Sequence, residues 1–99
     1  MKRNQMFNMI QQYQEKMQND IANIRVNASV GGGMVNVEMD GNRKILSLKI
    51  DPEVVKNEDI EMLQDLIIAA INEASRKVEE ETAGLMKSML GQFNIPGLF

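Results

Sequence analysis

The sequence contains no cysteine, no histidine and no tryptophan. Without cysteine it has neither a disulfide framework nor a thiolate metal site. Without histidine it lacks the commonest general base and the commonest metal ligand. One tyrosine and three phenylalanines leave few rings to stack on nucleic-acid bases. We therefore expect no enzymatic activity, no metal or other cofactor, and no binding site built on an aromatic platform.

Long apolar runs are also missing. No segment approaches the roughly 18 apolar residues that a bilayer-spanning helix needs. The basic start, Met1-Lys2-Arg3, resembles that of a signal peptide, but glutamine and asparagine interrupt the apolar residues that follow. We expect a cytoplasmic protein with no membrane partner. Its 99 residues suffice for one domain, which at this size buries only about 60–65% of its unfolded surface and has a thin core.

The charge is distributed unevenly along the chain. The formal net charge is −3, from 11 basic and 14 acidic residues. Residues 1–25 carry four basic and two acidic residues, whereas residues 52–99 carry four basic and nine acidic residues. Because charges are largely screened beyond about 8 Å at physiological salt, local patches matter more than this total.

Hydrophobic periodicity predicts a long helix over residues 4–25. Met6, Ile10, Tyr13 and Met17 recur at alternating spacings of four and three residues, which is typical of one apolar face of a helix. Its other faces are rich in glutamine and asparagine.

The periodicity then changes to two, which predicts a three-stranded antiparallel meander. Apolar and polar residues alternate in three segments, residues 26–30, 35–39 and 46–50. A strand rather than a helix follows Gly31-Gly32-Gly33, so we interpret these glycines as a hairpin loop and not as a phosphate-binding loop. Asp40-Gly41 predicts a tight turn into the third strand. Both edges of the sheet are expected to be unprotected.

Two helical segments are expected after the sheet. Asp51 can cap a short helical turn whose first residue is Pro52. Asn57 can cap a long helix over residues 58–90. Gly84 interrupts this helix at a cost of about 1 kcal/mol relative to alanine, so we expect a bend or a close contact there.

The long helix is too long for a compact globule. Its 33 residues span roughly 50 Å, whereas a globule of this chain length has a radius of gyration of about 13 Å. We therefore expect an elongated α+β protein in which the two long helices project from the sheet as an antiparallel pair. Residues 1–91 form the single domain, and residues 92–99 form an extended apolar tail. The open sheet edges and thin core predict a homodimer.

The basic residues are the candidate binding site for nucleic acid. In the proposed helix pair Lys2, Arg3 and Lys87, which lack an acidic residue three or four positions away, converge at one tip, where they could contact phosphates. Alternatively, these three residues serve only to keep the helix ends soluble. Arg43 and Lys44 form a second patch beside the predicted turn. Glutamates four residues away neutralise Arg76 and Lys77, in the pairs Glu73–Lys77, Arg76–Glu80 and Lys77–Glu81. The candidate set is Lys2, Arg3, Lys16, Arg25, Lys87, Arg43, Lys44, Arg76 and Lys77.

An ordered set of short segments resembles the YbaB/EbfC family of bacterial nucleoid-associated proteins over nearly the whole chain. These segments are Met9–Gln18, Gly33-Met34-Val35-Asn36-Val37, Asp40-Gly41, Ile50-Asp51-Pro52, Met62-Leu63-Gln64-Asp65-Leu66, Ala69-Ala70-Ile71-Asn72-Glu73-Ala74 with Arg76-Lys77, and Pro96-Gly97. The resemblance implies a tweezer-shaped homodimer that binds double-stranded DNA with weak sequence preference and has no enzymatic activity. It also implies a chromosomal neighbourhood shared with recombinational repair and clamp-loader genes. The acidic second half departs from what tight DNA binding would favour.

Two functional hypotheses follow. The first is a dimeric nucleoid protein that binds double-stranded DNA mainly through phosphates. The alternative is a non-enzymatic adaptor that docks on repair, recombination or replication proteins through its helix pair or its C-terminal tail.

Overall fold

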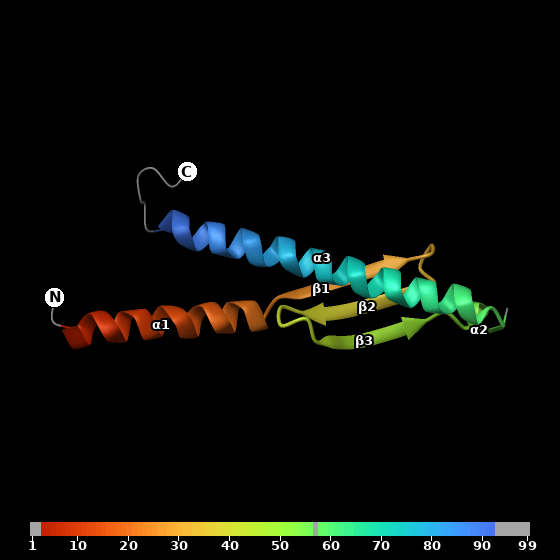
Figure 1. The fold of residues 1–99 in the computed structure, drawn as a ribbon, viewed down its shortest axis with the longest axis horizontal. Coiled ribbons are helices and arrows are strands. Elements are labelled where there is room, and N and C mark those ends of the chain that lie inside the picture. Colours follow the sequence, from red (N-terminus) through yellow and green to blue (C-terminus); the bar gives the residue numbers. More distant parts are fainter. Residues whose placement is uncertain (1–2, 57, 93–99) are drawn as a thin grey trace.

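The computed structural model describes residues 3–56 and 58–92 and confirms the predicted α+β architecture. Its elements are α1 (Arg3–Ala22), β1 (Arg25–Val30), β2 (Val35–Asp40), β3 (Ile45–Ile50), α2 (Pro52–Lys56) and α3 (Ile60–Gln92). The molecule measures 66 × 27 × 16 Å, with a radius of gyration of 19.3 Å. It is elongated because α1 and the second half of α3 extend beyond the sheet (Figure 1).

The sheet is an antiparallel meander in the order β1-β2-β3. Its second connection spans four residues, 41–44, and contains the predicted tight turn at Asp40-Gly41, in which the backbone N–H of Arg43 donates to the carbonyl of Asp40 at 3.0 Å. One carboxylate oxygen of Asp40 accepts hydrogen bonds from the backbone N–H groups of Asn42 and Lys44, both at 2.9 Å. Arg43 adopts a left-handed conformation with φ of 65°. The pairing register also shifts between Glu38 and Met39. The aspartate therefore stabilises both the tight turn and the rest of this four-residue loop.

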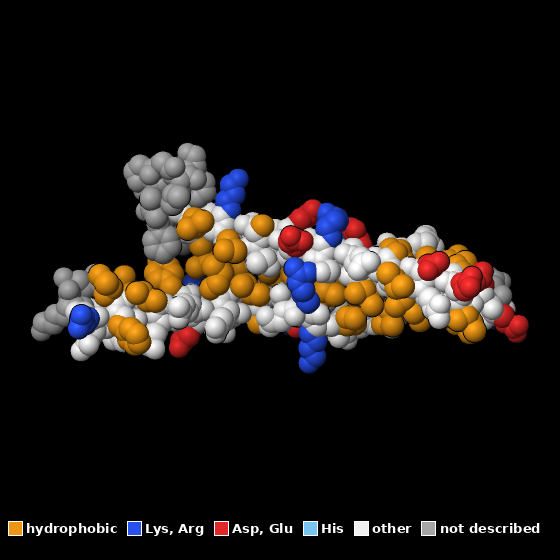
Figure 2. All heavy atoms as spheres, in the orientation of Figure 1, with side chains coloured by type: hydrophobic (Ala, Val, Ile, Leu, Met, Phe, Trp, Pro, Cys, Tyr) orange, Lys and Arg blue, Asp and Glu red, His pale blue; other side chains and the backbone are white. Residues whose placement is uncertain are grey.

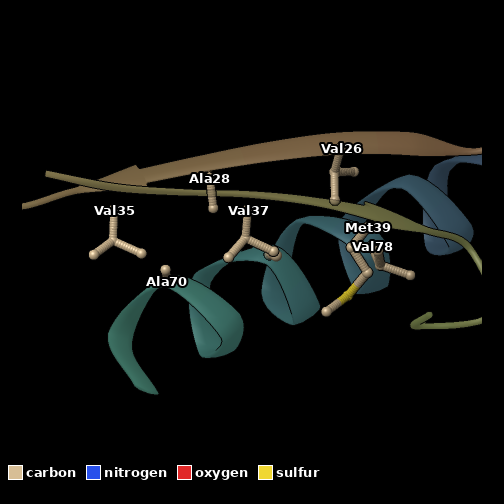
Figure 3. Packing of buried hydrophobic residues seen from close by; sticks show 8 residues of the cluster. Val26, Ala28, Val35, Val37, Met39, Ala70 and Val78 are labelled. Atoms are coloured by element: carbon tan, nitrogen blue, oxygen red, sulfur yellow. The ribbon is translucent and has the colours of Figure 1, made fainter. Parts of the chain in front are cut away.

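The core lies between one face of the sheet and the first half of α3. Alternate residues of β1 and β2 point toward the helix, and small residues of α3 allow a close approach (Figure 3). The buried cluster contains Val26, Ala28, Val35, Val37, Met39, Ala70, Ala74 and Val78. Because α3 packs across β1 and β2, the apolar residues of β3 are less well covered: Ile45, Leu46 and Leu48 remain 40–45% exposed.

The junction between α1 and the sheet is fixed by close contacts. The helix ends at Ala22 rather than at the predicted residue 25, because Arg25 begins β1. The Arg25 guanidinium donates to the carbonyls of Ala22 at 2.7 Å and Ile24 at 2.9 Å, which satisfies oxygens near the helix end. A Cβ on Gly41 would lie 1.8 Å from the carbonyl oxygen of Ile21. The β2–β3 loop thus packs directly against the end of α1.

The connection from β3 to α3 follows the predicted capping only in its first part. Asp51 accepts a hydrogen bond from the N–H of Glu53 at 2.9 Å, and Pro52 is the first residue of α2, as predicted. α3 begins at Ile60, two residues later than expected. Asp59 is its cap, because its carboxylate accepts the N–H of Met62 at 2.9 Å. The predicted cap, Asn57, lies outside the described residues.

The two long helices run in opposite directions and extend toward the same side of the molecule, as predicted (Figure 1). α1 nevertheless contains no buried residue, so in one copy of the chain its apolar face remains largely uncovered.

The close contact expected at Gly84 is absent from the described part of the chain, since a Cβ there would meet nothing within 4 Å.

Candidate nucleic-acid interface

Four basic side chains have no ion pair and no side-chain hydrogen bond with any other described residue. They are Arg3, Lys44, Lys49 and Lys87. All four are exposed, so their charges are available to an anionic partner without breaking an internal contact.

Two of these cations lie toward the same end of the molecule. Arg3 is the first residue of α1, and Lys87 lies five residues before the end of α3. The free ends of both helices extend away from the sheet on one side (Figure 1). Lys2, which the sequence places beside Arg3, lies outside the described residues.

Lys16 carries a weak internal contact. Its ammonium group lies 3.3 Å from the Asp20 carboxylate, and the two side chains are 59% and 34% exposed. Exposed ion pairs of this kind typically contribute 0–1 kcal/mol. A phosphate could therefore compete with Asp20 for Lys16 at little cost.

Arg25, Arg43 and Lys77 are held by the fold. Arg25 binds the two carbonyls at the end of α1, as described above. Arg43 donates to the backbone oxygen of Ser75 at 3.4 Å and to its hydroxyl, which ties the β2–β3 loop to α3. Lys77 donates to the backbone oxygen of Asn27 at 2.6 Å. These three cations hold elements together, and a phosphate would have to displace those contacts.

Arg76 is neutralised by acidic residues on its own helix. Its guanidinium binds Glu73 at 2.6 Å and also pairs with Glu80. The hydrogen bond with Glu73 raises the pKa of Arg76 and lowers the pKa of Glu73. The predicted Arg76–Glu80 pair is thus present.

The two pairs predicted for Lys77 do not form. The ion pairs within residues 3–56 and 58–92 include none between Lys77 and Glu73 or Glu81. The lysine reaches β1 instead, because α3 packs against that strand and leaves the Asn27 carbonyl within its range.

Sequence reasoning left Lys49 out of the candidate set. Its neighbours in β3, Leu48 and Ile50, pair with the core residues Val37 and Val35 across the ladder, so Lys49 points to the opposite, polar face of the sheet. There it lines a shallow depression with Asn27, Asn36, Val37, Glu38 and Ser47. The alternation of apolar and polar residues in β3 could have identified Lys49 as a cation on the polar face of the sheet.

Acidic residues gather at the other end of the molecule. Glu53, Glu58, Asp59, Glu61 and Asp65 lie in or beside α2 and the first turns of α3. Figure 2 shows this end as acidic, away from the free end of α1. A polyanion would be repelled from the acidic end. Because Glu79, Glu80 and Glu81 also lie on α3, the charge distribution favours contact near the free ends of the two long helices.

The described residues offer neither a metal site nor a membrane span. They contain no group of three or more acidic, histidine or cysteine side chains placed to hold a metal ion. Neither of the two long helices has an apolar stretch sufficient to cross a bilayer in its described residues.

Comparisons with known proteins agree with one another. Residues 1–93 match the model of the YbaB/EbfC DNA-binding family. A nucleoid-associated protein of Clostridium acetobutylicum is 52% identical over 88 residues, which cover 89% of this chain and 79% of the relative. A nucleoid-associated protein of Koribacter versatilis is 45% identical and covers 95% of this chain and 93% of the relative. The crystal structure of an uncharacterized Helicobacter pylori protein superposes with a TM-score of 0.74 at 26% identity, covering 91% of this chain and 98% of the other.

Proposed function

The chain belongs to the YbaB/EbfC DNA-binding family, and we propose that it is a non-enzymatic nucleoid protein that binds double-stranded DNA as a homodimer, mainly through phosphates. The observation that carries this proposal is the presence of free cations near the free ends of the two projecting helices, at the end of the molecule away from the acidic residues of α2 and the first turns of α3. Contacts to phosphates carry no direct sequence information, so the sequence preference is weak.

We rank the proposed DNA contacts by what each cation already binds in the described structure. Arg3 and Lys87 are free, and Lys16 holds only an exposed ion pair. We place Lys2 with them from its position in the sequence. Lys44, in the β2–β3 loop, is a further free cation that we include among the proposed contacts. The remaining members of the candidate set, Arg25, Arg43, Arg76 and Lys77, contribute less because phosphate binding competes with their internal partners.

The two edges of the sheet are not equivalent, and this asymmetry supports dimerisation through β3. Lys77 of α3 occupies an outward-facing carbonyl of β1, that of Asn27. A lysine at a sheet edge disfavours pairing with another strand. β3 is the opposite edge, and its Ile45, Leu46 and Leu48 are exposed beside the core. Pairing of two β3 strands about a two-fold axis would satisfy the open edge and cover these side chains.

The dimer part of the proposal is tested by Leu48→Lys. The substitution places a charge among the exposed apolar residues of β3 without touching the buried cluster. We expect light scattering to show a dimer for the wild-type protein and a monomer for the variant. Lys44→Ala, which changes a charge near the same strand but no apolar contact, should remain dimeric. A dimer that survives Leu48→Lys unchanged would contradict the β3 interface.

The DNA part is tested by charge reversal at Arg3 and Lys87. Gel shifts on several unrelated duplexes should show about equally weakened binding for the Arg3→Glu, Lys87→Glu variant. The matched control is Glu73→Gln with Arg76→Gln, which removes an internally neutralised cation together with one of its partners. We expect this control to bind nearly as well as the wild type. Equal affinity of the charge-reversed and wild-type proteins would exclude the helix ends as the contact surface.

A second candidate function rests on the exposed apolar residues of α1. Met6, Phe7, Met9 and Ile10 are 46–60% exposed, and methionine-rich surfaces adapt to varied protein partners. An adaptor that docks on repair, recombination or replication proteins would use this face. Capture of the same partner with and without nuclease treatment would favour the adaptor, whereas loss of the partner after nuclease treatment would favour DNA binding.

A further inference from the structure

A groove between α1 and the last part of α3 is lined by apolar side chains. Tyr13 and Met17 come from α1, and Met86, Met89 and Leu90 come from α3, with two glutamines of α1 beside them. The groove has a volume of about 590 Å³, and none of the described residues that line it is charged. Met86 is 49% exposed and Leu90 is 42% exposed. The groove therefore suits an apolar, uncharged occupant.

The described part of α3 ends close to the groove. The helix ends at Gln92, two residues after Leu90. Residues 93–99, which lie outside the described part of the structure, read Phe-Asn-Ile-Pro-Gly-Leu-Phe and carry no charged side chain. Four of the seven are large and apolar: Phe93, Ile95, Leu98 and Phe99. Pro96 opposes continuation of the helix through this segment.

Residues 93–99 are also long enough to reach along the groove. Seven residues can span up to about 23 Å when extended. The stretch of α3 from Gln92 back to Met86 is six residues long, or about 9 Å. A segment that reverses direction after Gln92 can therefore reach every α3 residue of the groove and cross to Met17.

We propose that residues 93–99 fold back from the end of α3 and occupy this groove in the same chain, with their apolar side chains against Met17, Met86 and Leu90. Methionine accommodates irregular neighbours because its side chain is unbranched and flexible. The contact joins α1, which has no buried residue in the described structure, to α3. The tail thereby sets the separation of the two projecting helices. This inference does not depend on DNA binding.

The chain provides unusually clean probes for a test. It has no cysteine, so Asn94→Cys creates a single site for a spin label in the tail, and its nine methionines give a small set of methyl signals. Met17 is the decisive signal because it lies across the groove from α3. We expect the label to broaden the Met17 methyl signal at least twofold more than it does in a polar-tail control. That control carries the same label together with Ile95→Ser, Leu98→Ser and Phe99→Ser. Equal broadening in the two proteins overturns the proposal.

A mixed sample identifies whose tail fills the groove. One population carries the spin label, and the other carries the ¹³C-methyl methionines but no label. We expect no excess broadening of Met17 in this mixture, because the tail binds its own chain. Excess broadening of Met17 in the mixture would show a tail exchanged between copies and would overturn the intramolecular contact.

Tyr13 supplies an independent readout, because it is the only tyrosine of a chain without tryptophan. Its fluorescence should be quenched by acrylamide about twofold more efficiently in the unlabelled polar-tail variant than in the wild type. Circular dichroism should show that both proteins are folded. Unchanged quenching in a folded polar-tail variant would contradict occupation of the groove by residues 93–99.

Discussion

Gly41 and Gly84 form a matched pair of positions at which the same substitution should change stability in opposite directions. A Cβ on Gly41 would lie 1.8 Å from the backbone oxygen of Ile21 and 2.8 Å from its carbonyl carbon. Because these are backbone atoms, no side-chain rotation can relieve the overlap. Gly84 lies inside α3, where a Cβ would meet nothing within 4 Å.

The magnitudes follow from these two environments. Overpacking typically costs 1–3 kcal/mol, and a clash with backbone belongs at the upper end, so Gly41→Ala should lower the free energy of unfolding by about 3 kcal/mol. Alanine is favoured over glycine inside a helix by about 1 kcal/mol. Gly84→Ala should therefore raise the free energy of unfolding by about that amount, which corresponds to roughly 4–8 °C in Tm for a domain of this size.

Urea denaturation at one fixed protein concentration measures both changes, since the stability of a dimer depends on concentration. A Gly41→Ala protein as stable as the wild type would refute the packing of the β2–β3 loop against the end of α1. A destabilised Gly84→Ala protein would show that Gly84 contacts another surface, such as a second copy of the chain.

Two further predictions concern single side chains. Asp59→Ala removes the carboxylate that accepts the N–H of Met62 at the start of α3, and urea denaturation should show a loss of about 1 kcal/mol; no loss would refute its capping role. The hydrogen bond from Arg76 lowers the pKa of Glu73 in the folded protein. The stability that this hydrogen bond contributes is therefore complete above the ordinary glutamate pKa, and it is lost as the pH falls through the lowered pKa of Glu73. Between about pH 5 and pH 3 the wild type should thus lose more stability than Glu73→Gln, and identical acid profiles would contradict this linkage.

The sequence predicted those parts of the fold that depend on local periodicity. Alternation of apolar residues identified all three strands, and the four-three spacing identified α1. The tight turn at Asp40-Gly41 was predicted as well, but the four-residue length of the β2–β3 loop was not, because Asp-Gly is equally compatible with a shorter loop. What selects the longer loop is the pair of hydrogen bonds to the Asp40 carboxylate, together with the proximity of Gly41 to Ile21. Neither contact is visible in a local pattern.

In the candidate site, too, local sequence patterns did not show the contacts between distant residues. The rule that pairs charges four residues apart identified Arg76 with Glu80 correctly, because both lie on one helix. It failed for Lys77, whose acceptor Asn27 is 50 residues away in the sequence. Arg43 likewise binds Ser75 of α3. Which cations are free for a partner therefore depends on the packing of α3 against the sheet, and only the structure distinguishes Lys87 from Lys77.

In the proposed mode of binding, free cations near the ends of the projecting helices contact DNA phosphates. The most direct test is a titration of duplex DNA over a range of salt concentrations. If Arg3 and Lys87 of each protomer neutralise about four phosphates per dimer, these contacts should contribute about −3.6 to the slope of log K against log salt. The slope should become shallower by about that amount in the Arg3→Gln, Lys87→Gln variant, in which Lys2, Lys16 and Lys44 remain. A wild-type slope near zero, or an unchanged slope in the variant, would contradict phosphate binding by the helix ends.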